Sequence, residues 1–103
     1  MARVVVSTVA QADTAAVLRD LAAKAGHSVA ADYAASLEAL YGQLAVHPDS
    51  GAPRPVFGRH VRMGMVLPYL VFYRHLPDSD LVGVIRVLHG SRHITRKLLR
   101  GAS

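Results

Sequence analysis

The chain has 103 residues and a net charge of +5. Its length suits one domain, residues 1–103. With 51% hydrophobic residues, it is too apolar for global disorder. Because it contains no cysteine, disulfides, thiolate zinc sites and a cysteine nucleophile are excluded. Its apolar runs are shorter than the roughly 20 residues of a membrane helix and no signal peptide is apparent, so we expect a cytoplasmic protein without membrane contact.

A strand opens the expected fold. The three consecutive valines within residues 3–7 are β-branched, which favours a strand over a helix. Ser7 or Thr8 then suits the N-cap of an alanine-rich helix over residues 10–25. Gly26 is placed to end that helix in a left-handed conformation.

A second helix is expected to follow at once. Ser28 suits its N-cap, and His47 stops it, because the residue before Pro48 is pushed out of the α region. With only one or two residues between the two helices, we expect an antiparallel helix hairpin. The apolar residues that recur at helical spacing along the second helix are Val29, Tyr33, Leu37, Leu40, Tyr41 and Leu44.

The second half of the chain predicts strands after a turn-rich connection. Residues 59–66, 69–76 and 81–88 have the composition and alternation of strands, and Pro77 begins the turn between the last two. Residues 93–100 predict a short basic helix. The order of elements indicates an α+β fold, in which an antiparallel three-stranded meander carries the helices on one face.

Basic residues concentrate in the second half. Residues 1–50 hold three basic and five acidic residues, a balance of −2, whereas residues 51–103 hold nine basic and two acidic residues, a balance of +7. This asymmetry indicates an acidic protein or nucleic acid as partner, and a solvated basic surface is the plain alternative. An ion pair within the fold explains Arg74 or Arg86 equally well. The arginines that could bind phosphates or carboxylates bidentately are Arg59, Arg62, Arg74, Arg86 and Arg92.

The histidines are poorly arranged for a metal. His89 and His93 are four residues apart, but Gly90 interrupts helical spacing, so no metal site is expected. Glycine motifs for dinucleotides or phosphates are absent, so no cofactor is expected. A triad of Ser91, His89 and Asp80 can be drawn on paper, but no nucleophile-elbow glycines surround the serine. If the protein cleaves RNA by acid–base catalysis, the candidate catalytic residues are Arg62, Arg86, His89 and Arg92.

Two segments resemble a known family. Residues 69–74, Tyr-Leu-Val-Phe-Tyr-Arg, and residues 84–93, Val-Ile-Arg-Val-Leu-His-Gly-Ser-Arg-His, are similar to the ParE branch of the ParE/RelE superfamily of type II toxin–antitoxin modules. Residues 44–54 resemble the helix-to-sheet connection of that family. The resemblance runs over nearly the whole chain, and the RelE/ParE-like fold that it implies has the element order inferred above.

The resemblance implies a toxin that a cognate antitoxin neutralises. Such an antitoxin, ParD-like or another DNA-binding type, would fold an acidic and apolar segment onto the toxin, and DNA would be contacted only through the antitoxin. ParE-like members are associated with poisoning DNA gyrase, and RelE-like members with ribosome-dependent mRNA cleavage. The expected partner-binding residues are Arg59, Arg62, Arg74, Arg86, Arg92, Leu37 and Tyr41.

The residues favour gyrase over mRNA as the target. Arg62 takes a strand position where RNase toxins carry a basic residue, but residues 48–68 contain no lysine and residues 89–103 contain no tyrosine. His89 and Gly90 stand where an RNase toxin places a key arginine. We therefore expect a non-enzymatic, gyrase-directed toxin. The alternatives are an mRNA endoribonuclease and a non-toxic homologue that only binds the antitoxin.

Overall fold

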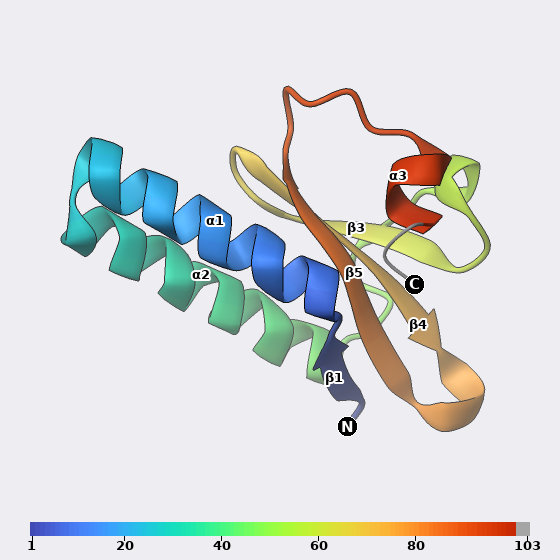
Figure 1. The fold of residues 1–103 in the computed structure, drawn as a ribbon. Coiled ribbons are helices and arrows are strands. Elements are labelled where there is room, and N and C mark those ends of the chain that lie inside the picture. Colours follow the sequence, from blue (N-terminus) through green and yellow to red (C-terminus); the bar gives the residue numbers. More distant parts are fainter. Residues whose placement is uncertain (101–103) are drawn as a thin grey trace.

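The computed structural model describes residues 1–100, which form one twisted sheet with a helix hairpin on one face and a short helix on the other (Figure 1). The α+β class expected from the sequence is confirmed. The elements are β1 (Arg3–Val6), α1 (Thr8–Ala25), α2 (His27–Val46), β2 (Ala52–Pro53), β3 (Val61–Val66), β4 (Tyr69–Leu76), β5 (Leu81–His89) and α3 (Arg96–Arg100), with single 3-10 turns η1 (Pro55–Phe57) and η2 (Pro77–Ser79).

The sheet has five strands in the order β1-β5-β4-β3-β2, so the prediction of a three-stranded meander was incomplete. The antiparallel meander β3–β4–β5 is present as its centre. β1 adds to it in parallel beside β5, and the two-residue β2 adds antiparallel to β3. β1 needs this partner because the polar backbone of an unpaired strand would be left without hydrogen bonds.

Gly26 joins the two helices in a way that the sequence did not predict. It ends α1 as expected, but its φ of 97° and ψ of 162° are not left-handed helical. The same residue serves as N-cap of α2, which begins at His27, so the predicted cap at Ser28 was wrong. A glycine is required by the positive φ alone, since a Cβ would meet no atom within 4 Å. At the other end of α1, the Ser7 side chain accepts a hydrogen bond from the Ala10 N–H, as expected of an N-cap.

Two predicted elements start later than the sequence indicated. β3 starts at Val61, because His60 has a positive φ of 62° and turns the chain. α3 starts at Arg96, where the Thr95 hydroxyl accepts the Leu98 N–H. None of the helices within residues 1–100 is long and apolar enough to cross a membrane.

The sheet separates two apolar cores. The larger one, which we call the hairpin core, packs β4 and β5 against α1 and α2; the smaller one, the α3 core, lies on the opposite face. A β-bulge beside Phe72 and Tyr73 gives β5 one extra residue, Ile85, which joins the α3 core. The buried residues are Ala2, Ala10, Leu37, Leu44, Tyr69, Val71, Tyr73, Val82, Val84 and Val87 in the hairpin core, and Val61, Phe72, Ile85, Leu88 and Leu99 in the α3 core.

Candidate functional site

The start of α1 completes the edge of β5 where β1 ends. Ser7 donates its hydroxyl to the Ile85 carbonyl at 3.0 Å. Further along α1, the Asp13 carboxylate accepts the Val87 N–H at 3.1 Å. The same carboxylate binds Arg86 bidentately, with Nε and Nη2 at 2.7 and 2.9 Å. A helix side chain thus replaces the missing strand at this edge and neutralises the arginine.

Arg86 is therefore bound within the fold. Its side chain is 12% exposed and that of Asp13 is 13% exposed. The hydrogen bonds from Asp13 raise the pKa of Arg86, although burial acts in the opposite direction. Nη1 also donates to the Leu98 carbonyl at 3.3 Å, so one guanidinium links β5 to α1 and α3. The alternative of an internal ion pair is confirmed for Arg86, and its role in partner binding or catalysis stays a prediction.

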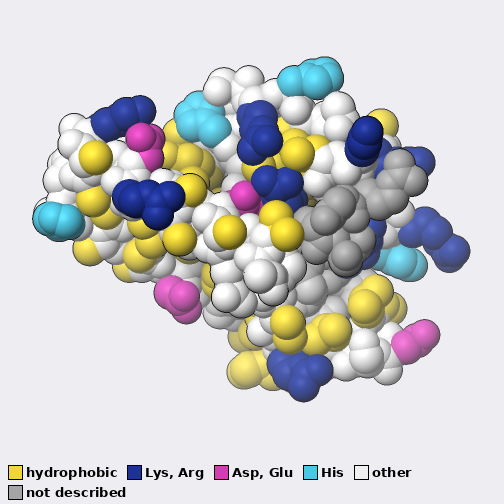
Figure 2. All heavy atoms as spheres, viewed as in Figure 1, with side chains coloured by type: hydrophobic (Ala, Val, Ile, Leu, Met, Phe, Trp, Pro, Cys, Tyr) yellow, Lys and Arg dark blue, Asp and Glu magenta, His cyan; other side chains and the backbone are white. Residues whose placement is uncertain are grey.

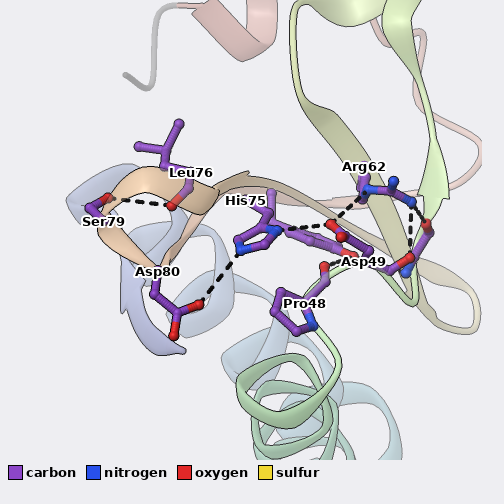
Figure 3. A network of polar contacts seen from close by, with 9 residues as sticks. Pro48, Asp49, Arg62, His75, Leu76, Ser79 and Asp80 are labelled. Carbon is purple, nitrogen blue, oxygen red and sulfur yellow. Dashed lines mark hydrogen bonds and ion pairs between the residues drawn. The ribbon is translucent and has the colours of Figure 1, made fainter. Parts of the chain in front are cut away.

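A second polar network holds the connection that follows α2 (Figure 3). Arg62 on β3 donates through Nη1 to the backbone carbonyls of Asp49 and Gly51 at 2.9 and 2.8 Å. Its Nε lies 3.4 Å from the Asp49 carboxylate, which also lies 2.8 Å from Nδ1 of His75 on β4. On the other side of the ring, Nε2 lies 3.7 Å from Asp80. Figure 3 shows the Asp49 carboxylate between Arg62 and His75, so both side chains position this connection.

Tyr73 completes the attachment of the connection to the sheet. Its hydroxyl donates to the Pro48 carbonyl and accepts the Gly51 N–H, both at 2.9 Å. Burial raises the pKa of Tyr73, and the hydrogen bond from Gly51 lowers it in part. The segment between α2 and β2 is thus held by Tyr73 and His75 from β4 and by Arg62 from β3.

The end of β5 brings His89, Ser91 and Arg92 to an exposed edge. His89 Nδ1 accepts the Ser91 N–H at 3.0 Å and lies 2.8 Å from the Ser91 hydroxyl, and its ring meets Tyr69 edge-on at 5.6 Å. Asp80 precedes β5 at the opposite end of the strand, so the triad drawn from the sequence is not assembled. A shallow cavity of about 290 Å³ here is lined by residues that include His89, Arg92 and Tyr69.

The four candidate nuclease residues do not converge. The register places Arg62 opposite Tyr73 of the hairpin core and Arg86 opposite Phe72 of the α3 core, so these arginines lie on opposite faces of the sheet. Arg62 and Arg86 are each engaged in the networks described above. Within residues 1–100, no three His, Asp or Glu side chains lie close enough together to hold a metal ion.

The remaining expected arginines lie on the α3 side of the sheet. Arg74 on β4 donates through Nε to the Arg59 carbonyl at 3.3 Å, and Arg59 itself is exposed in the loop after η1. These contacts leave both arginines without a carboxylate partner among the described residues.

The helix hairpin presents two grooves, one mainly apolar and one whose lining also includes Asp32, Ser36 and Gln43. Tyr41 lines the mainly apolar groove, of about 450 Å³, between α1, α2 and β1; burial raises the pKa of Tyr41, and its buried hydroxyl oxygen has no hydrogen-bond partner among residues 1–100. Leu37 lies beneath the surface in the hairpin core and is only 4% exposed. The other groove, of about 630 Å³, lies between α2 and the turn from β3 to β4, where Met65 and Leu67 are 58% and 70% exposed. Sequence reasoning missed these two residues, although an apolar residue before Pro68 in a turn was a signal.

Comparison with known proteins agrees with this geometry. Residues 4–94 match the family described as "ParE toxin of type II toxin-antitoxin system, parDE". Among solved structures, the chain is similar to one described as "Chromosomal ParDE TA system from P. aeruginosa", with a TM-score of 0.71 and 19% sequence identity over 86% of this chain and 96% of that chain. At this identity the likeness concerns the fold. No curated protein matches the chain.

Proposed function

Because the chain belongs to the ParE toxin family of type II toxin–antitoxin systems, we propose that it arrests growth by inhibiting DNA gyrase and that a cognate antitoxin neutralises it. The family match over residues 4–94 carries this proposal. Gyrase inhibition is a binding function, which requires an accessible surface and no set of catalytic groups. The protein would act in the cytoplasm, where gyrase is found.

The separation of the basic residues supports gyrase over mRNA as the target. Cleavage of RNA needs an acid or base and a phosphate-binding cation within hydrogen-bond reach of one phosphate. Arg62 and Arg86 lie on opposite faces of the sheet, and each is engaged in a contact within the fold. His89 and Arg92 remain at the β5 edge as the only pair of the four that could act together there.

The grooves beside α2 support an antitoxin segment as the partner. Exposed Met65 and Leu67 lie along one groove and Tyr41 along the other, and such surfaces are typical of protein-binding sites. An acidic and apolar segment would bury these residues, and its carboxylates could pair with Arg92 if the segment extends to the separate cavity at the end of β5. Leu37 is buried in the hairpin core, so its direct contact with a partner would require the helices to separate.

Induced expression without a neutralising partner tests the proposal. We expect growth arrest with loss of plasmid supercoiling and a DNA-damage response, because an inhibited gyrase no longer introduces supercoils. Plasmid topology and transcript integrity are measured in the same cells. Cut transcripts at the ribosome with unchanged topology would show the nuclease, and unimpaired growth would show a non-toxic homologue.

His89→Ala separates catalysis from binding without disturbing the buried networks. If the toxin is not an enzyme, we expect the growth rate after induction to stay within about twofold of that with the parent chain. His89 is exposed, and its contacts described above are the hydrogen bonds with Ser91 and the edge-on packing against Tyr69. The exposed His27→Ala is the matched control. Loss of toxicity in His89→Ala but not in His27→Ala, at equal protein levels, would favour the nuclease.

A further inference from the structure

A group of basic side chains surrounds η1 on the α3 side of the sheet. Arg96 donates from α3 to the carbonyls of Val56 and Pro55 at 3.2 and 3.3 Å, and Arg74 donates from β4 to the carbonyl of Arg59 at 3.3 Å. The loop that carries η1 is thus held between two arginines. Together with the exposed residue after Arg96 they form what we call the η1 cluster, which consists of Arg59, Arg74, Arg96 and Lys97.

The charge of the η1 cluster is not neutralised within the described chain. The ion pairs among residues 1–100 engage Lys24, Arg62, His75 and Arg86, and none reaches the cluster. The only acidic residues after residue 50 are Asp78 and Asp80, in or next to η2; Asp80 lies beside His75, and neither aspartate forms an ion pair with the cluster. Figure 2 shows Lys and Arg side chains gathered at the upper right of the molecule, around α3 and η1, with no acidic side chain among them in that view.

Toward residues 1–100, the guanidinium groups of Arg74 and Arg96 leave most of their donors unused. Each carries five N–H groups; within these residues Arg74 uses only Nε, and Arg96 uses Nε and Nη2. Because backbone carbonyls fix these side chains without neutralising them, the remaining N–H groups are oriented before any ligand arrives. Guanidinium groups held in place in this way can donate two parallel hydrogen bonds to the oxygens of a phosphate or carboxylate group.

The surroundings favour phosphate over a protein segment. Val56, at 67% exposure, is the large exposed apolar residue beside the cluster, whereas exposed Met65 and Leu67 lie in a groove along α2. An acidic segment that folds on binding needs apolar residues to contact, and the grooves beside α2 offer them. Cations spread over β4, the η1 loop and α3, without such anchors, match the repeated charges of a nucleic-acid backbone.

We propose that the η1 cluster binds the phosphodiester backbone of duplex DNA, so that the toxin contacts DNA directly. This departs from the expectation that DNA is reached only through the antitoxin. The choice of duplex DNA over RNA rests on the gyrase-directed function proposed above, because gyrase holds duplex DNA. The cluster then adds a sequence-independent contact to the toxin while it is bound to a gyrase–DNA complex.

Binding of a 20-base-pair duplex of arbitrary sequence, followed by fluorescence anisotropy across a salt titration, tests this inference with the full chain. Arg59→Glu combined with Lys97→Glu changes two exposed residues and spares the arginines that hold the η1 loop. Each backbone contact contributes about 0.9 to the slope of log affinity against log salt. We therefore expect the double variant to lose about two units of slope and at least about tenfold in affinity at low salt.

The matched control, Arg3→Glu combined with Arg19→Glu, makes the same change of net charge at exposed positions on β1 and α1. An equal loss of DNA affinity in this control would show that binding depends on net charge alone, and it would overturn the inference. Binding of polyglutamate as tight as that of DNA would indicate that the cluster binds an acidic protein and would overturn the inference. Tighter binding of single-stranded RNA would overturn the choice of DNA.

A supercoiling assay distinguishes the two proposals. Inhibition of gyrase without DNA binding overturns only this inference, and cluster-dependent DNA binding without inhibition overturns only the proposed function.

Discussion

Asp13→Ala is expected to lower the free energy of unfolding by about 3 kcal/mol or more, the usual cost of breaking a largely buried ion pair from one side. The carboxylate accepts three hydrogen bonds, two from Arg86 and one from the Val87 N–H. Its removal leaves a guanidinium with 12% exposure facing an apolar helix surface, and it reopens the edge of β5. Urea denaturation followed by circular dichroism measures the loss.

Asp20→Ala is the control on the same helix. Asp20 pairs with Lys24 at 3.2 Å, but both side chains are more than half exposed, so we expect a change within about 0.5 kcal/mol. Combining Asp13→Ala with Arg86→Met should recover part of the loss, because the unpaired charge is removed with its partner. Equal losses for Asp13→Ala and Asp20→Ala would show that the ion pair does not stabilise the sheet edge.

Gly51→Ala is expected to cost about 3 kcal/mol, the upper part of the range for overpacking a filled site. The new Cβ would stand 2.5 Å from the Tyr73 hydroxyl and 2.8 Å from the Met63 carbonyl oxygen. Either the tyrosine or the backbone must move, and the hydrogen bond from the Gly51 N–H to Tyr73 is then lost. The same denaturation measurement gives the size of the loss.

Alkaline titration adds a second measurement at this site. Burial holds the pKa of Tyr73 above its ordinary 10.0, so the folded state loses stability as the pH rises above about 10, where the unfolded chain releases the proton more readily. Gly51→Ala should raise the pKa of Tyr73 further, because the lost hydrogen bond from the Gly51 N–H is one that lowers it. The control is Gly42→Ala in the interior of α2, where a Cβ meets no atom within 4 Å; it should stabilise the chain by about 0.5–1 kcal/mol. A neutral Gly51→Ala would contradict the close approach of Gly51 and Tyr73.

Elements whose signals are local could be predicted from the sequence. The helix hairpin was predicted from the helical spacing of apolar residues and from Gly26 and Pro48. These signals are local, because periodicity and backbone restriction act within a few residues. Alternation and β-branched residues set β4 and β5, and residues 69–74 and 84–93 carried the resemblance to the family that the match over residues 4–94 shows. The cap at Ser7 was predictable for the same reason.

The pairing of remote elements was decided only by the tertiary structure. β1 joins β5 in parallel although paired residues such as Val6 and Val84 are 78 positions apart (84 − 6). Nothing local in either strand specifies that partner. β2, with two residues, is too short to show alternation. Such pairings depend on how the helix hairpin packs, which no window of sequence contains.

The roles of the charged residues were decided in the same way. Asp13 gave no signal in the sequence, because a single acidic residue in a helix is typical of a solvated surface, and its partner Arg86 lies 73 residues away. Arg62 and Arg86 belong to one basic half of the sequence, yet alternation and the bulge at Ile85 place them on opposite faces of the sheet. Composition sets the amount of positive charge, but strand register decides which charges are neutralised in the fold and which stay free around η1.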